Sequence, residues 1–223
     1  MGTEETDQEA SAKPRWWTKR LAIVFAAIAS LIVLGLIAFF VYASAYYHDL
    51  DTEDVYQIST TEIPVTQGSN YLAFGDTDSY SALVFYPGAK VEFSAYSPLM
   101  RELAAKGHLC VVVEMPFNFA FLDSDAARDV MNQFPLVSRW WIGGHSLGGA
   151  IAADYVAAHP AEFEGLLLLG SYSASDLSAT DLSVCSIYGS NDLVLNMDSL
   201  VTSRGFMPNE YSERIIEGGN HAY

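Results

Sequence analysis

Residues 136–153 read LVSRWWIGGHSLGGAIAA, and this stretch decides the fold. Within it, residues 144–148 (GHSLG) fit the pattern G-x-S-x-G of a nucleophile elbow, a sharp turn that exposes a serine between a strand and a helix. A match of five residues can arise by chance, so the flanking sequence has to agree with it. Leu136–Ile142 has the apolar and aromatic character of a strand, and Gly149–Ala153 opens a helix-forming run. The stretch therefore predicts a strand, a tight turn at Ser146 and a helix.

Short apolar runs alternate with amphipathic stretches from Tyr71 onward, as in βαβ units built on a mostly parallel sheet. Several runs are apolar at consecutive positions, which is typical of strands covered on both faces. The strands that we expect are Tyr71–Phe74, Ala82–Tyr86, Leu109–Glu114, Trp140–Gly143, Gly165–Leu169, Val184–Tyr188 and Arg214–Ile216. The helices that we expect are Ser94–Lys106, Ser124–Gln133, Leu147–Ala158 and Met197–Ser203.

The elbow predicts two further residues, because a serine hydroxyl needs a histidine base and a carboxylate that orients the base, in the chain order serine, acid, histidine. His221 fits the base, since it lies in a Gly-rich loop after the last expected strand. Asp192 fits the acid, since it follows the strand Val184–Tyr188 at the sheet edge where such folds bind ligands.

Other residues compete for these two places. Asp176 and Asp181 lie in a Ser-rich loop and remain rivals for the acid. His159 ends the helix that starts at the elbow, where a C-terminal capping role is more common. His145 lies inside the elbow, but its position next to Ser146 should aim its side chain elsewhere.

An oxyanion hole needs two backbone N–H donors, one from the residue after the nucleophile and one from the loop after an early strand. Leu147 is the first candidate. The second is Ala89, because residues 86–90 (YPGAK) end the strand Ala82–Tyr86 and Gly88 gives the loop freedom to aim that amide. The alternative is an ordinary Pro-Gly turn.

Several motifs together resemble one family. They are YPGAKVE (86–92), EMPFNFAFLD (114–123), GGHSLGGA (143–150), IYGSND (187–192) and EGGNHA (217–222). From about residue 71 to its end the chain resembles the α/β-hydrolase fold family, and within it the dienelactone hydrolases and small bacterial carboxylesterases. The resemblance implies a mostly parallel sheet flanked by helices, and hydrolysis of an ester or similar acyl bond with Ser146 as nucleophile, Asp192 as acid and His221 as base.

Two departures from that family matter. Dienelactone hydrolases carry a cysteine nucleophile where this chain has Ser146, so we expect a different substrate. The family continues past its histidine with more loop and a final helix, whereas this chain ends at Tyr223, so we expect that the hydrolase domain (71–223) is truncated.

The segment Leu21–Tyr42 runs 22 residues without a charge, and about 20 apolar residues suffice to cross a bilayer. Lys19 and Arg20 precede it and several acids follow it, which predicts a cytoplasmic tail (1–20), a transmembrane anchor (21–42) and an outward domain. Residues 43–70 are expected to form a stalk with one strand-like run at 55–58. The alternative is a signal peptide cleaved near Ala45, because residues 43–45 read ASA.

Charge and composition limit the classes of partner and cofactor that we expect. The 223 residues carry a formal charge of −16, which disfavours nucleic acid. We expect no metal and no cofactor, since neither metal-ligand spacing nor a phosphate loop with a lysine is present. Cys110 and Cys185 lie in apolar runs and are expected to be buried thiols.

The substrate is expected to be a small molecule or a cell-surface acyl group in an open site, because residues 171–183 are too few for a helical cap. Phe117, Phe119 and Tyr172 are candidates for lining an acyl or aromatic pocket, although such residues are more often core. Two other functions remain open: acyl transfer to an acceptor other than water at the cell surface, and a catalytically silent binding module.

Overall fold

The computed structural model describes residues 15–48 and 53–222. The chain divides into two units, residues 1–44 and residues 45–223. The first unit contains α1 (Arg15–Ser44), of which Trp16–Ser44 form a helix of 29 residues that is long and apolar enough to span a membrane. The hydroxyl groups of Ser30 and Ser44 donate to backbone carbonyl oxygens within this helix. Residues 1–14 of the expected tail lie outside the described residues.

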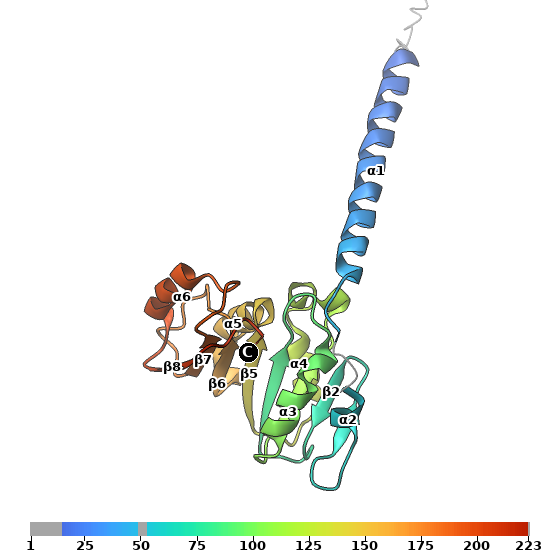
Figure 1. Cartoon of the computed structure of the whole chain (residues 1–223). Coiled ribbons are helices and arrows are strands. Elements are labelled where there is room, and N and C mark those ends of the chain that lie inside the picture. The colour runs from blue at the N-terminus through green and yellow to red at the C-terminus, as the bar shows by residue number, and fades with distance from the viewer. Residues whose placement is uncertain (1–14, 49–52, 223) are drawn as a thin grey trace, which may run out of the picture. The chain divides into compact units, whose positions relative to one another are not determined.

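The second unit is built on an eight-stranded sheet in the order β1-β2-β4-β3-β5-β6-β7-β8. Figure 1 shows β5, β6, β7 and β8 side by side in this order. β1 and β2 pair antiparallel, as do β2 and β4, and every other neighbouring pair is parallel. The strands are β1 (Val65–Gln67), β2 (Tyr71–Phe74), β3 (Ser81–Tyr86), β4 (Leu109–Val113), β5 (Arg139–His145), β6 (Gly165–Leu169), β7 (Ser183–Gly189) and β8 (Glu210–Ile216). The predicted mostly parallel sheet is confirmed.

Helices cover both faces of this sheet. The helices of this unit are α2 (Glu53–Gln57), which packs against α3, and α3 (Ser97–Ala104), α4 (Ala126–Gln133), α5 (Leu147–Ala158) and α6 (Met197–Ser203). α4 and α5 contribute small side chains such as Ala127 and Ala153 to the core on one face, whereas α3 contributes Met100 to the core on the other. α6 packs Leu200 against Tyr188 at the end of β7. The expected helical layers are therefore present on both sides.

β4 shows why the central strands are apolar at consecutive positions. All five of its residues are buried. Leu109, Val111 and Val113 belong to the core beneath α4 and α5, and Cys110 and Val112 belong to the core beneath α3. Because successive side chains of a strand point to opposite faces, a sheet covered twice needs apolar residues at every position. Each buried side chain of this size contributes about 1.5–3 kcal/mol.

The segment expected to be a stalk takes part in the second unit. Val65–Gln67 form β1 and pair with β2, and the backbone of Tyr47 bridges to that of Val91. The strand-like run at 55–58 is wrong, since Glu53–Gln57 form the helix α2. The guanidinium of Arg101 donates to the carbonyl oxygens that end this turn, at residues 56 and 58, which stabilises the helical ending. Residues 49–52 of the expected stalk lie outside the described residues.

Candidate active site

Ser146 occupies the turn between β5 and α5, in the strand–turn–helix context that the sequence predicts. Its φ of 52° and ψ of −124° lie in a region that non-glycine residues rarely adopt. A Cβ at Gly148 would lie 2.2 Å from the carbonyl oxygen of Pro87, and one at Gly144 would lie 2.5 Å from the Gly148 carbonyl carbon. Only glycines allow helix and strands to approach this closely, so the motif's glycines have a steric purpose.

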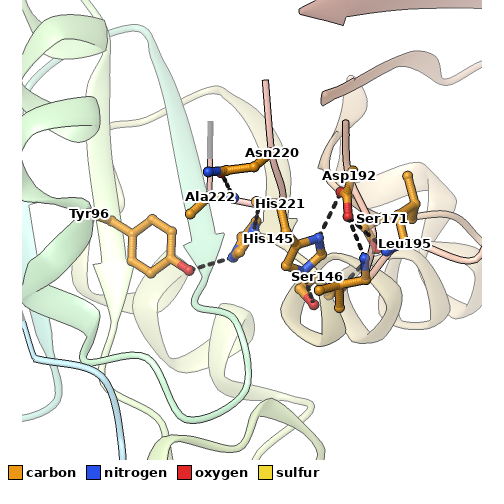
Figure 2. Close-up of polar contacts among 10 residues, drawn as sticks. Tyr96, His145, Ser146, Ser171, Asp192, Leu195, Asn220, His221 and Ala222 are labelled. Carbon is orange, nitrogen blue, oxygen red and sulfur yellow. Dashed lines mark hydrogen bonds and ion pairs between the residues drawn. The ribbon is translucent and has the colours of Figure 1, made fainter. Parts of the chain in front are cut away.

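Three side chains from distant parts of the chain meet at this turn (Figure 2). The Nε2 atom of His221 lies 2.9 Å from Oγ of Ser146, and its Nδ1 atom lies 2.8 Å from Oδ2 of Asp192. A carboxylate only accepts hydrogen bonds, so Nδ1 carries the proton in this arrangement. Nε2 is then free of a proton and accepts the hydroxyl hydrogen of Ser146.

The loops that carry the acid and the base are joined to each other. The amides of Ser190 and Asn191 donate to the carbonyl oxygens of Ile216 and Gly219, and the Gly218 amide donates to Oγ of Ser190. These hydrogen bonds therefore hold the loop after β7 and the loop after β8 in fixed positions relative to each other. They also fix the distance between the Asp192 carboxylate and the His221 imidazole.

The carboxylate of Asp192 is fully buried, with 0% of its side chain exposed. Its Oδ1 atom accepts hydrogen bonds from the amides of Val194 at 2.9 Å and Leu195 at 2.8 Å. Burial alone raises the pKa of this group, but the hydrogen bonds from the Leu195 amide, from His221 and from the Val194 amide outweigh burial. The pKa of Asp192 therefore lies below its ordinary value, and the group is ionised at neutral pH.

The two candidate oxyanion donors lie on segments that meet at the elbow. Leu147 is the first residue of α5, where a backbone N–H has no partner inside the helix. Ala89 follows Gly88, whose added Cβ would lie 2.7 Å from Nδ1 of His145. The loop after β3 thus touches the elbow, although the roles of both amides stay predictions.

The rival residues lie elsewhere. His159 ends α5 and contacts Glu162 and Arg128 with its ring. Asp176 and Asp181 are exposed, and the Asp176 carboxylate accepts the amide of Ser178. The structure brings Asp192, rather than either of these acids, to His221.

The three aromatic residues predicted to line a pocket have different environments. Phe119 is buried and packs on Phe121, whereas Phe117 is half exposed with a φ of 53°. Tyr172 packs against the cluster around Tyr188 and lines a cavity of about 330 Å³ beside α6. Substrate contact by any of them stays a prediction.

Two residues near the turn have no site role that the sequence predicts. Ser171 donates from Oγ to the carbonyl oxygen of Ser146 at 2.8 Å, and Tyr96 lies 2.8 Å from the ring of His145. Only tertiary structure brings them to the elbow, so no local pattern could reveal them. Among residues 15–48 and 53–222, no group of three or more His, Cys, Asp or Glu side chains could hold a metal ion. Both thiols are free. Cys110 is buried as expected, whereas Cys185 is only partly buried, because it lies at one of the half-buried positions that alternate along β7.

Comparisons with known proteins identify the family and the fold of this chain. The family model described as the alpha/beta hydrolase family matches residues 82–223. A search of curated proteins found no match. Similar solved structures include a carboxylesterase of the thaumarchaeon Nitrososphaera gargenis, with 14% identity, a TM-score of 0.58 and coverage of 74% of this chain and 90% of that one.

Two further structures have the same fold. The 2-hydroxy-6-oxo-6-phenylhexa-2,4-dienoate hydrolase of a Rhodococcus species has 14% identity and a TM-score of 0.59, with coverage of 71% of this chain and 92% of that one. A membrane phospholipase A described as a bacterial virulence factor has 13% identity and a TM-score of 0.57, with coverage of 93% and 92%. At these identities the likeness concerns the fold alone.

Proposed function

The chain belongs to the alpha/beta hydrolase family, and from this premise we propose that it is a serine hydrolase that cleaves an ester or similar acyl bond through an acyl-enzyme. One observation carries the proposal. The hydroxyl of Ser146, the imidazole of His221 and the carboxylate of Asp192 form a continuous chain of hydrogen bonds of 2.9 and 2.8 Å. Such a chain activates a serine that is otherwise a weak nucleophile.

The first half of the reaction forms the acyl-enzyme. Oγ of Ser146 attacks the carbonyl carbon of the substrate while its proton passes to Nε2 of His221. Asp192 stabilises the imidazolium that results, since its buried carboxylate stays ionised. The imidazolium then returns the proton to the leaving alcohol as the carbon–oxygen bond breaks. In the second half water attacks, His221 takes its proton, and Ser146 is released with its hydrogen restored.

The negative oxygen of each tetrahedral intermediate requires hydrogen-bond donors. We assign this role to the amides of Leu147 and Ala89, which come from the elbow and from the loop after β3. A single such donor typically contributes about 2.7–4 kcal/mol to stabilising the transition state.

Covalent labelling of the full chain in detergent tests the serine mechanism. A fluorophosphonate should label the wild type at Ser146 and should not label Ser146→Ala. Ser203→Ala is the matched control, because Ser203 is also buried and its hydroxyl bonds only to the carbonyl oxygen of Leu200 in α6. Label that persists in Ser146→Ala would place the nucleophile elsewhere. A folded wild type without label would favour the silent binding module.

The acceptor is the second question, because water and an alcohol compete for the same acyl-enzyme. We propose water as the acceptor and a small-molecule or cell-surface acyl ester as the substrate. Turnover of a panel of acyl esters, with and without added alcohols, tests this. Product acid should form in stoichiometric amounts. Preferential formation of new esters would indicate an acyltransferase.

We place the enzyme on a membrane through α1, with its N-terminus inside and the second unit outside. The length and apolar surface of Trp16–Ser44 support the anchor, and Lys19 with Arg20 at its N-terminal end supports the orientation. Protease added to intact cells should digest residues 45–223 and spare a cytosolic control. Protection of both would contradict the orientation, and release of the domain into the medium would indicate cleavage near Ala45.

A further inference from the structure

The imidazole of His145 lies directly before the nucleophile in sequence, yet it contacts other groups. Its Nδ1 atom lies 2.8 Å from the hydroxyl oxygen of Tyr96, and its Nε2 atom lies 2.8 Å from the backbone carbonyl oxygen of His221 (Figure 2). The side chain is buried, with 7% of the residue exposed. Both ring nitrogens are therefore engaged away from Ser146.

The positions of the hydrogen atoms follow from the partners. A carbonyl oxygen only accepts, so Nε2 of His145 carries the hydrogen that it donates to His221. In the neutral ring Nδ1 is then an acceptor, and the Tyr96 hydroxyl donates to it. The Tyr96 oxygen can in turn accept, and the amide of Gly88 donates to it at 2.9 Å. Burial lowers the pKa of His145 and so favours this neutral form.

This chain of hydrogen bonds joins the elbow, the loop that carries His221 and the loop after β3. The proposed reaction needs all three segments in fixed relative positions. One end holds the backbone of His221, whose ring faces Ser146. The other end holds the amide of Gly88, next to Ala89 in the loop after β3. A Cβ at Gly88 would lie 2.7 Å from Nδ1 of His145 and 3.1 Å from the Tyr96 oxygen. The backbone of this loop therefore packs directly against both side chains. The Gly88 amide is already committed to Tyr96, which leaves the next amide, that of Ala89, for a substrate oxygen.

We propose that Tyr96 and His145 are positioning residues. They hold the base His221 and the oxyanion donor Ala89 in fixed positions relative to each other and to the elbow. The inference rests on the proposed serine hydrolase function and adds two residues to it. Neither touches the substrate. They act through His221 and through the loop after β3, so their loss should slow the chemical step more than it weakens substrate binding.

Substitutions separate the two halves of the pair. Tyr96→Phe removes the hydroxyl and leaves both Nδ1 of His145 and the Gly88 amide without that partner. His145→Asn keeps an acceptor near the position of Nδ1 but removes the donor to His221, whereas His145→Gln keeps a donor near the position of Nε2. Tyr86→Phe is the matched control. Tyr86 is also buried, and its hydroxyl oxygen also accepts an amide, that of Ala127, while donating to the carbonyl oxygen of Ser124.

The measurement is kcat and KM for a chromogenic acyl ester, with the full chain in detergent and kcat normalised to the sites titrated by a fluorophosphonate. Tyr96→Phe and His145→Asn should each lower kcat about 10- to 100-fold with KM changed less than about threefold. His145→Gln should recover part of the loss. The double variant that combines Tyr96→Phe with His145→Asn should lose no more kcat than the worse of these two single variants, since both residues belong to one chain of hydrogen bonds. Tyr86→Phe should lower the unfolding temperature and leave normalised kcat unchanged.

The outcomes also separate this inference from the proposed function. Wild-type kcat in Tyr96→Phe, or losses that simply multiply in the double variant, would overturn the positioning role while the labelled wild type upholds the serine hydrolase. A loss in Tyr86→Phe equal to that in Tyr96→Phe would show that any buried tyrosine hydroxyl matters, and would overturn the role as well. A folded wild type that is neither labelled nor active would overturn both.

Discussion

The amide nitrogen of Tyr47 lies 2.7 Å from the carbonyl oxygen of Lys90. The amide of Glu92 completes the pairing by donating to the Tyr47 carbonyl at 3.0 Å. The segment at the start of the second unit is thereby fastened to the loop that carries Ala89, the proposed oxyanion donor. Lys90 has a φ of 59°, so this loop depends on its neighbours to keep an uncommon conformation.

Tyr47→Pro should reduce activity through the backbone alone. Proline removes the N–H that bonds to Lys90, whereas Tyr47→Ala keeps it and loses only a ring that is 74% exposed. We expect Tyr47→Pro to lose roughly 0.5–1.5 kcal/mol of stability and about tenfold in kcat. Tyr47→Ala should resemble the wild type. Thermal unfolding and ester hydrolysis by the full chain measure both effects, and equal behaviour of the two variants would contradict the coupling.

Ionisation of Asp192 should make the free energy of unfolding depend on pH. Its pKa in the folded state lies below the ordinary value of 3.8. The ionised carboxylate therefore stabilises the fold fully above that value, and its contribution disappears as the pH falls through the lowered pKa. Urea unfolding from pH 7 to pH 3 should show the wild type losing stability relative to Asp192→Asn below about pH 4. A constant difference between the two across this range would refute the assignment.

The same variant should affect catalysis at neutral pH. An amide at position 192 can donate a hydrogen bond to Nδ1 of His221, which favours the wrong tautomer of the base. Loss of this orientation typically lowers kcat on the order of 10³- to 10⁴-fold. Ester hydrolysis at pH 7 measures the loss. A variant with more than a tenth of wild-type turnover would argue that His221 does not depend on Asp192.

Much of this fold could be predicted because local pattern and tertiary environment agree. The bounds expected for α5 and β6 match the structure, since the elbow marks the start of one and a run of buried apolar residues defines the other. β1 is missing from the expected strands because it is only three residues long and mostly exposed, although it pairs with the neighbouring β2 in a local hairpin closed by residues 68–70. The run at 55–58 has the residue types of a strand, but residues 55–57 belong to the helix α2, where Arg101 donates to the carbonyl oxygen of Tyr56.

The candidate site also contains residues that could be predicted from the sequence and residues that could not. A motif indicates Ser146, and chain order with strand position indicates Asp192 and His221; the structure brings these three side chains together. The hydrogen bond between Tyr96 and His145 forms only in the folded chain, because the two residues lie 49 positions apart in the sequence. Sequence patterns identify groups that react, whereas groups that position them from another segment emerge only when the chain is folded.

His221 and His159 should differ sharply when each is replaced by alanine. His221→Ala removes the group that accepts the Ser146 proton, so turnover should fall by about 10³-fold or more. His159→Ala removes ring contacts with Glu162 and Arg128 at the end of α5, and turnover should stay within about twofold because exposed pairs contribute little. Hydrolysis rates per folded protein provide the measurement. Similar losses in both variants would rule out His221 as the specific base.

Ser146→Gly should raise stability while abolishing turnover. At a φ of 52° and a ψ of −124° a side chain typically costs about 1–3 kcal/mol, and glycine adopts this conformation without that strain. Glycine also costs about 0.5–1 kcal/mol by freeing the unfolded chain, so the net gain in stability should lie between about 0 and about 2.5 kcal/mol. Ser146→Ala is the control, because it removes the hydroxyl but keeps Cβ and therefore the strain. Urea unfolding should rank Ser146→Gly above Ser146→Ala; the reverse order would show that the strain at this serine is smaller than the conformational cost of a glycine, and would contradict the prediction.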